Sequence, residues 1–310
     1  MIRSRWLWVL VVAALAVGAA FAQGNDGEPT RVRDVIYGKK GGVALTLDVF
    51  KPAQPNGIGV LWMVSGGWFS SHDAISPDIA RVFTKRGQTV FAIVHGSQPK
   101  YSIPEIVQDI DRASRFVHAH AKEYGVDPKR ICISGGSAGG HLSLMQGARG
   151  HDGDPKAKDP VDQQSSRVRA VACFFPPTDF LNYGEMDRNA LAVEELKPFR
   201  PAFGPYKMEK PDIDNVAREE SPIYSVTKAM PPTLIIHGDA DKLVPIQQAQ
   251  LMMKKLEEVG VAHELVVRPG QGHGWPTLLE DCKLLADWFD KYAGRGREVA
   301  LSFPSPLRPS

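Results

Sequence analysis

The sequence is poor in the residues that would indicate several common classes of protein. Its three cysteines are too few for a disulfide-stapled scaffold. Lys and Arg number 37 against 35 Asp and Glu, and this balance lacks the basic excess that phosphate binding needs, so we expect no nucleic-acid partner. No phosphate loop, dinucleotide motif or Cys/His cluster occurs, so the sequence implies no cofactor and no metal. With 43% hydrophobic and 23% charged residues, the composition is that of an ordinary folded protein.

Long apolar runs are also scarce, and the clearest one lies at the N-terminus. Arg3 and Arg5 precede an uncharged, mostly apolar stretch over residues 6–22 that ends in Ala-Phe-Ala. A short basic region, an apolar region and a small-x-small ending predict a cleaved signal peptide over 1–22. The alternative is an uncleaved anchor, for which this stretch is at the short limit. We therefore expect an exported chain, periplasmic or secreted, with no stable membrane span after cleavage.

After a polar linker at 23–30, strand-like and helix-like segments alternate to residue 293. An alternating pattern at 43–50, following a predicted strand at 32–37, indicates an antiparallel hairpin. Runs rich in Val and Ile, typical of strands buried on both faces, lie at 59–64, 89–94, 131–134, 168–174, 233–237 and 262–267. Amphipathic helical patterns between and after them include 74–86, 106–117, 137–147, 246–259 and 278–292. The prediction is one α/β domain over 31–293, with a mostly parallel eight-stranded sheet, an antiparallel N-terminal hairpin and helices on both faces.

Two proline-rich segments interrupt this alternation. Residues 179–221 form a predicted irregular, cap-like insertion, and residues 294–310 a predicted disordered tail. Whether the insertion closes over a site is open at this point. Its aromatic side chains either line a substrate pocket or only anchor a surface loop: Tyr183, Phe199, Phe203 and Tyr206.

The cysteines lie in apolar segments. Cys132 and Cys173 are inside strand-like runs, and Cys282 is on the last predicted helix. We expect buried free thiols at the two strand positions, the alternative being a bridge between neighbouring strands.

The strongest chemical signal is a serine between a strand and a helix. Gly135, Ser137 and Gly139 form a G-x-S-x-G motif directly after the run at 131–134. Such a sharp turn exposes the serine hydroxyl, and it needs glycine where a Cβ would collide with a neighbouring strand or helix. The N–H of Ala138 then lies at a helix N-terminus, where it can stabilise an oxyanion. The alternative is a helix-entry turn without chemistry.

A serine is a weak nucleophile unless a base removes its proton. With this motif, an acid and then a histidine are expected on loops after later strands. His273, in the glycine-rich loop after the last strand run, is the candidate base, and Asp241, 32 residues earlier, is the candidate acid. Asp239 is the alternative acid, but it lies closer to the strand end, where a carboxylate more often braces a turn.

A second oxyanion donor is expected in the loop after the run at 59–64. There Gly66 and Gly67 precede Trp68, and glycine lets backbone N–H groups approach a substrate closely. The alternative is a turn without this role.

Taken together, these segments resemble an α/β-hydrolase of the esterase/lipase group, close to hormone-sensitive-lipase-like and BD-FAE-like (acetylxylan/feruloyl esterase) carboxylesterases. The resemblance extends from Val43 to Tyr292 and is carried by Leu-Thr-Leu-Asp-Val-Phe-Lys-Pro at 45–52, Gly-Gly-Trp at 66–68, Gly-Gly-Ser-Ala-Gly-Gly at 135–140, His-Gly-Asp-Ala-Asp at 237–241 and Gly-His-Gly at 272–274.

The resemblance implies an α/β-hydrolase fold and a set of roles. Its nucleophile, acid and base would be Ser137, Asp241 and His273, and its oxyanion donors Gly66, Gly67 and Ala138. The sequence departs from the family's usual His-Gly-Gly-Gly-Trp, because Val64 and Ser65 take the places of the His and the first Gly.

The expected function is that of a serine carboxylesterase. It would hydrolyse short-acyl or aryl esters through an acyl-enzyme, on small molecules or glycans such as polysaccharides bearing acetyl or feruloyl groups. One alternative is a dipeptidyl-peptidase-like serine peptidase, although such enzymes usually carry a large extra N-terminal domain. Another is a catalytically silent hydrolase fold that only binds a ligand. The sequence does not set the oligomeric state.

Overall fold

The computed structural model describes residues 28–205 and 208–294. The signal peptide predicted at 1–22, most of the predicted linker, Tyr206, and all of the predicted tail but Gly294 lie outside these residues. Within the described ranges, no helix combines the length and apolar character needed to cross a bilayer.

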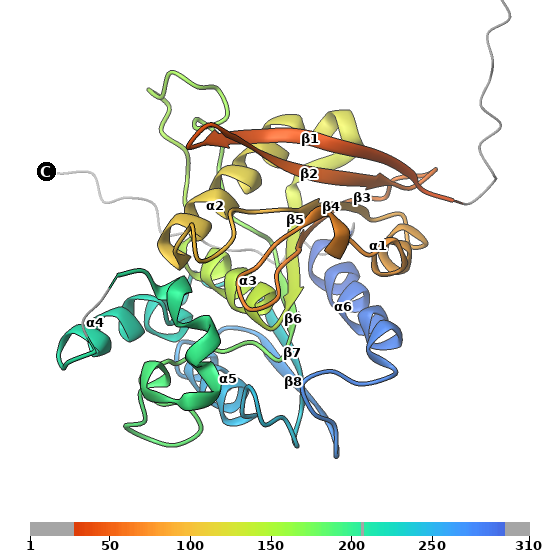
Figure 1. The fold of residues 1–310 in the computed structure, drawn as a ribbon. Helices are drawn as coiled ribbons and strands as arrows, with labels where there is room; N and C mark the ends of the chain where they lie inside the picture. Colours follow the sequence, from red (N-terminus) through yellow and green to blue (C-terminus); the bar gives the residue numbers. More distant parts are fainter. Residues whose placement is uncertain (1–27, 206–207, 295–310) are drawn as a thin grey trace, which may run out of the picture.

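An eight-stranded sheet runs through the molecule (Figure 1). Its strands are β1 (Thr30–Lys40), β2 (Val43–Lys51), β3 (Gly57–Met63), β4 (Thr89–Ile93), β5 (Val126–Gly136), β6 (Val171–Phe174), β7 (Thr233–Gly238) and β8 (His263–Arg268). They lie in the order β1-β2-β4-β3-β5-β6-β7-β8. β2 pairs antiparallel with both β1 and β4, and all pairs from β4 to β8 are parallel. The predicted mixed sheet with an N-terminal hairpin is confirmed.

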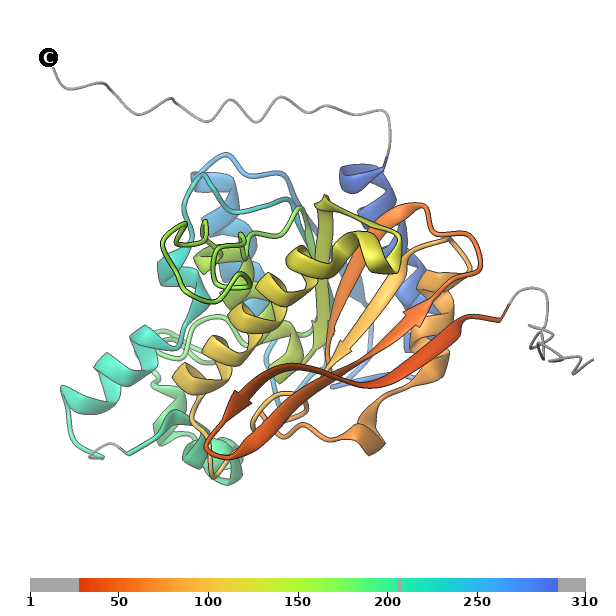
Figure 2. The same ribbon diagram turned by 90° about the horizontal axis from the view of Figure 1, so that it is seen from above.

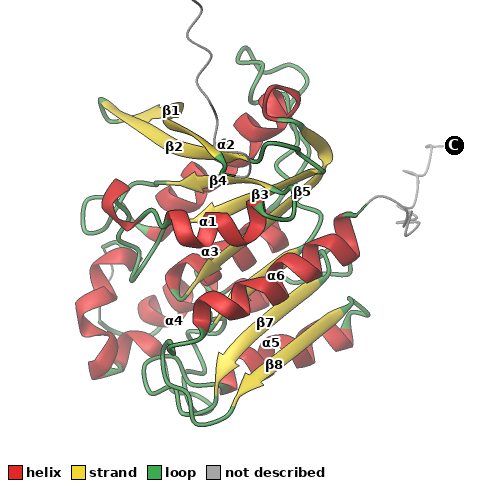
Figure 3. Cartoon of the chain, turned by 90° about the vertical axis from the view of Figure 1, so that its right-hand side faces the viewer, coloured by secondary structure: helices red, strands yellow, loops and turns green. Residues whose placement is uncertain are grey.

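Helices cover both faces of this sheet, which is why its central strands are rich in Val and Ile. On one face lie α1 (Pro77–Thr84) and α6 (Leu278–Ala293), as Figure 3 shows, and Phe83 of α1 stacks on Phe289 of α6 with ring centroids 6.2 Å apart. The other face is covered by α2 (Ile103–His120), α3 (Ala138–Arg149) and α5 (Gln247–Glu258). Seen from above, the β1–β2 hairpin extends along the edge of the sheet beside α2 (Figure 2).

Two segments differ from the prediction. The insertion at 179–221 is not irregular throughout, because residues Asp212–Glu219 form the helix α4, which buries Ile213 and Ala217 (Figure 1). Prolines on either side of this short amphipathic stretch obscured its helical spacing in the sequence. The helix predicted from residue 74 begins instead at Pro77, because Ser76 is extended and its hydroxyl accepts the N–H of Ile79 at 3.3 Å.

The three cysteines are buried and free. The expectation of buried free thiols at Cys132 and Cys173 is confirmed, and Cys282 shares that state. Burial raises the pKa of all three thiols, that of Cys282 to about 12.

Parallel pairing brings the loops that follow β3, β5, β7 and β8 to one edge of the sheet. The carboxyl ends of parallel strands are where open α/β sheets place their sites. All of the candidate catalytic residues lie in these loops or at the start of α3.

Candidate active site

Ser137 lies in a strained turn between β5 and α3. Its φ of 54° and ψ of −121° are unusual for a residue with a side chain. A Cβ on Gly135 would come within 2.6 Å of the backbone carbon of Gly139, and a Cβ on Gly139 within 2.8 Å of the Met63 carbonyl oxygen. Both glycines of the motif are therefore required by the close approach of α3 to the sheet.

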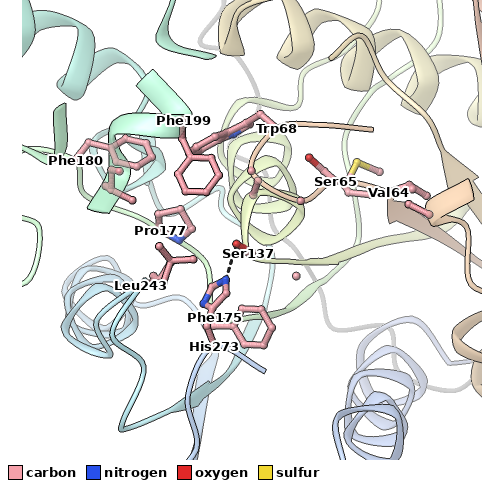
Figure 4. Close-up of a pocket in the computed structure, with 18 of the residues that line it drawn as sticks. Val64, Ser65, Trp68, Ser137, Phe175, Pro177, Phe180, Phe199, Leu243 and His273 are labelled. Atoms are coloured by element: carbon pink, nitrogen blue, oxygen red, sulfur yellow. Dashed lines mark hydrogen bonds between the residues drawn. The ribbon is translucent and has the colours of Figure 1, made fainter. Parts of the chain in front are cut away.

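The structure brings Ser137, His273 and Asp241 into one chain of hydrogen bonds. His273 Nε2 is 2.8 Å from Ser137 Oγ (Figure 4), and on the other side of the ring His273 Nδ1 is 2.7 Å from Asp241 Oδ2. An ionised carboxylate only accepts hydrogen bonds, so Nδ1 carries the proton and Nε2 is left to accept the serine O–H. This is the arrangement a base needs in order to take a proton from the serine.

Asp241 is held ionised by its surroundings. Its side chain is buried, and Oδ1 accepts the N–H groups of Leu243 at 2.9 Å and Val244 at 3.0 Å. Burial by itself would raise the pKa of Asp241, but hydrogen bonds from His237, His273 and the Val244 N–H outweigh it and keep the pKa well below its usual range. A fixed negative charge therefore lies beside the imidazole of His273.

Asp239, the alternative acid, has a different place. It is exposed, and its Oδ1 accepts the N–H of Gly270 at 2.6 Å. Asp239 therefore connects the loop after β7 to the loop that carries His273. Asp241, two residues later in the chain, is the carboxylate that contacts the imidazole.

His237 has a contact with the site that sequence reasoning missed. The side chain is fully buried, and Nε2 lies 2.8 Å from the Val244 carbonyl oxygen and 3.4 Å from Asp241 Oδ2. The spacing of four residues between His237 and Asp241 across a strand end is the signal that could have indicated this contact.

The loop after β3 makes a tight turn over residues 66–69. The N–H of Gly66 donates to the Phe69 carbonyl at 3.0 Å, and the Phe69 N–H donates back to the Gly66 carbonyl at 2.9 Å. Gly66 was expected as an oxyanion donor, but its N–H is already engaged, so the structure does not support it in that role. The N–H groups of Gly67 and Ala138 have no partner among the described residues, and both residues line one pocket with Ser137.

That pocket has a volume of about 520 Å³ and mostly apolar walls (Figure 4). Three aromatic residues of the insertion line it: Tyr183, Phe199 and Phe203. The sequence left open whether these side chains line a pocket or only anchor a surface loop, and the structure places all three at the pocket. Other lining residues come from the loops after β3, β6 and β7: Val64, Ser65, Trp68, Phe175, Pro177, Leu243 and Val244. Among the described residues, no group of three or more His, Cys, Asp or Glu side chains is placed to hold a metal ion.

Known proteins are similar to this chain in sequence and in fold. Esterase LipC of Mycobacterium tuberculosis is 28% identical over 255 residues, which are 79% of this chain and 60% of LipC. A truncated carbohydrate esterase from gut microbiota superposes with a TM-score of 0.73 at 27% identity, over 87% of this chain and 98% of that one. Propionate-bound esterase 2 of Thermogutta terrifontis gives a TM-score of 0.66 at 27% identity, over 83% of this chain and 93% of that one.

The chain spans 52% to 60% of the length of three curated mycobacterial relatives that it matches. The two structural neighbours named above, in contrast, are covered almost completely. A family model described as BD-FAE matches residues 47–256, which is more than half of the chain. With this match and the eight-stranded sheet described above, the protein belongs to the BD-FAE family of α/β-hydrolases.

Proposed function

We propose that the protein is a serine carboxylesterase that hydrolyses short-acyl or aryl esters. The observation that carries the proposal is the hydrogen-bond chain from Ser137 through His273 to Asp241, beside an apolar pocket of about 520 Å³. Family membership and the esterases among its relatives support it.

In the proposed mechanism, His273 Nε2 takes the proton of Ser137 as Oγ attacks the ester carbonyl carbon. The negative charge that develops on the carbonyl oxygen is stabilised by the N–H groups of Gly67 and Ala138. Asp241 orients the imidazole and stabilises its protonated form. His273 then gives the proton to the departing alcohol, and water activated by the same imidazole hydrolyses the acyl-enzyme.

The turn at 66–69 favours this role for Gly67. The Gly67 N–H and the Gly66 carbonyl belong to the same peptide group. That carbonyl accepts the Phe69 N–H at 2.9 Å. Hydrogen bonds in a chain polarise one another, so this acceptor strengthens the Gly67 donor.

The size and lining of the pocket support small acyl or aryl groups. Esterase 2 of Thermogutta terrifontis has been solved with propionate and with butyrate bound, and another neighbour is named as a carbohydrate esterase. We extend the proposal to acetyl or feruloyl esters of polysaccharides as the natural substrates, and to export through the signal peptide at 1–22. Export is tested by the N-terminal sequence of the protein recovered from the culture medium or the periplasm, which should begin at Gln23.

A panel of p-nitrophenyl esters from acetate to octanoate, with acetylated xylan and aminoacyl anilides beside it, tests the activity. We expect turnover of the shorter esters that is lost in Ser137→Ala. Preference for the anilides would favour the dipeptidyl-peptidase-like alternative. A folded wild type without turnover of any substrate would favour a silent binding protein.

A further inference from the structure

The turn that carries the Gly67 donor is bound to a second loop, over residues 94–102, which joins β4 to α2. Ser97 and Ser70 interlock, because Ser97 Oγ accepts the Ser70 N–H at 2.8 Å and donates to the Ser70 carbonyl at 2.9 Å. The backbone N–H of Gln98 donates to the Trp68 carbonyl at 3.2 Å. The Gln98 side-chain amide donates to the Gly67 carbonyl at 2.7 Å. The second loop therefore reaches both residues at the centre of the turn.

The turn needs such support because its backbone is strained. Gly67 and Trp68 both have positive φ, at 55° and 61°, and consecutive positive φ values are typical of a type I′ turn. Glycine tolerates this conformation, whereas tryptophan adopts it only when its surroundings enforce it.

The indole of Trp68 has its own anchor. It packs against Phe180 and Phe203, and its Nε1–H donates to His141 Nδ1 at 3.3 Å. Burial lowers the pKa of His141 to about 4, so the ring is neutral and Nδ1 accepts while Nε2–H donates to the Glu220 carbonyl at 2.7 Å. These contacts fix the Trp68 side chain, but they leave the Gly67 peptide groups to be oriented by something else.

The Gln98 side chain is placed to do this. It is buried, with 3% of its surface exposed, and it holds the carbonyl of Gly67, a residue that lines the pocket. The peptide that carries the Gly67 N–H is held through its Gly66 carbonyl by Phe69, and Gln98 holds the next peptide, between Gly67 and Trp68. Without the Gln98 donor, the freedom of glycine would let this second peptide rotate, and the distorted turn would carry the Gly67 N–H away from the oxyanion position. Gln98 is not among the residues that line the pocket, so it has no direct contact with a substrate there.

We propose that Gln98 is a positioning residue that keeps the Gly67 N–H aimed at the oxyanion. The inference rests on the proposed esterase function, and it assigns a role in the reaction to a residue outside the hydrogen-bond chain and outside the pocket. Its effect falls on the transition state, in which the oxyanion is charged, and little on binding of the neutral ester.

Gln98→Met tests the proposal, because methionine keeps the length and apolar stem of the side chain and removes the donor. We expect kcat for p-nitrophenyl acetate to fall roughly 10- to 100-fold, with KM within about twofold of wild type. The inhibition constant of a boronic acid, whose tetrahedral adduct places an oxygen in the oxyanion position, should rise by a similar factor.

Gln146→Met is the matched control. Gln146 is equally buried, and its side-chain amide donates to the Ser166 carbonyl at 2.7 Å, but it does not line the pocket. Both variants lose one buried bond of the same kind, so both should unfold at a somewhat lower temperature than wild type. Only the variant at Gln98 should lose kcat and boronic-acid affinity.

Gln98→Glu serves as a second variant. It keeps the shape of the side chain, and when assayed at a pH at which the carboxyl is ionised it turns an acceptor towards the Gly67 carbonyl. At that pH its loss of kcat should equal or exceed that of the methionine variant. If either folded variant at Gln98 keeps kcat within twofold of the Gln146→Met control, or if the loss falls on KM alone, Gln98 has no positioning role. If the wild type itself hydrolyses no ester, the proposed function fails first, and that result is distinct from an active wild type with an equally active Gln98 variant.

Discussion

Replacing Asp241 by asparagine should nearly abolish esterase activity while leaving the fold in place. Asp241 Oδ1 already accepts two backbone N–H groups, those of Leu243 at 2.9 Å and Val244 at 3.0 Å. An asparagine would put its carbonyl oxygen there, because only the oxygen can accept them. Its NH₂ group would then occupy the place of Oδ2 and face His273 Nδ1, which lies 2.7 Å away.

That exchange reverses the imidazole tautomer. Nδ1 would have to accept, so the proton would move to Nε2, which then points a hydrogen at Ser137 Oγ and cannot act as its base. A wrong tautomer in a triad of this kind costs about 10⁴-fold in kcat, which is about 5.4 kcal/mol of transition-state stabilisation. The assay is kcat for p-nitrophenyl acetate with enzyme whose folded state has been checked by circular dichroism.

Asp239→Asn provides the matched control, two residues earlier in the same loop. Its Oδ1 accepts only the Gly270 N–H, which an asparagine oxygen can also do, so this variant should keep kcat within about threefold of wild type. If Asp241→Asn retained a tenth of the wild-type kcat, or if Asp239→Asn lost as much as Asp241→Asn, the assignment of the acid to Asp241 would be refuted.

Three further predictions concern stability and burial. The pKa of Asp241 is lowered in the folded state, so its carboxylate stabilises the fold at pH values above the usual pKa of about 4. Acidification below that pH should therefore lower the unfolding temperature of wild type more steeply than that of Asp241→Asn. Gly139→Ala would place a Cβ 2.8 Å from the Met63 carbonyl and should destabilise the fold by roughly 1–3 kcal/mol in thermal unfolding, whereas Gly272→Ala, which meets no atom within 4 Å, should not. The three thiols, buried and with raised pKa values, should react with a disulfide reagent only after unfolding, so fast reaction of a native thiol would contradict their burial.

The elements that local pattern specifies were predictable from the sequence. Continuous Val and Ile runs such as that of β7 indicate strands buried on both faces, and parallel pairing then brings their carboxyl ends together. Ser137, Asp241 and His273 each follow a strand, so their order and spacing predicted a meeting that the structure shows at 2.7 and 2.8 Å.

What the sequence could not predict depends on contacts between distant segments. The Gly66 N–H is bonded to the Phe69 carbonyl because the chain makes a tight turn there, with a positive φ at Trp68. Tryptophan rarely adopts a positive φ, so its presence in the sequence did not indicate this turn. Gln98 reaches Gly67 across 31 residues, and His141 reaches Trp68 across 73, through loop packing that no periodicity encodes. The helix α4 was missed because a short amphipathic stretch bordered by prolines carries a weak pattern.

The central claim, that Ser137 is a nucleophile activated by His273, is tested most directly by labelling with a fluorophosphonate and locating the adduct by peptide mass spectrometry. The account predicts one adduct per chain on Ser137, formed rapidly by wild type and absent from Ser137→Ala. Labelling of wild-type protein should be greatly slowed in His273→Ala. A folded wild type that forms no adduct, or one that is modified at another residue with Ser137 unlabelled, would contradict the claim.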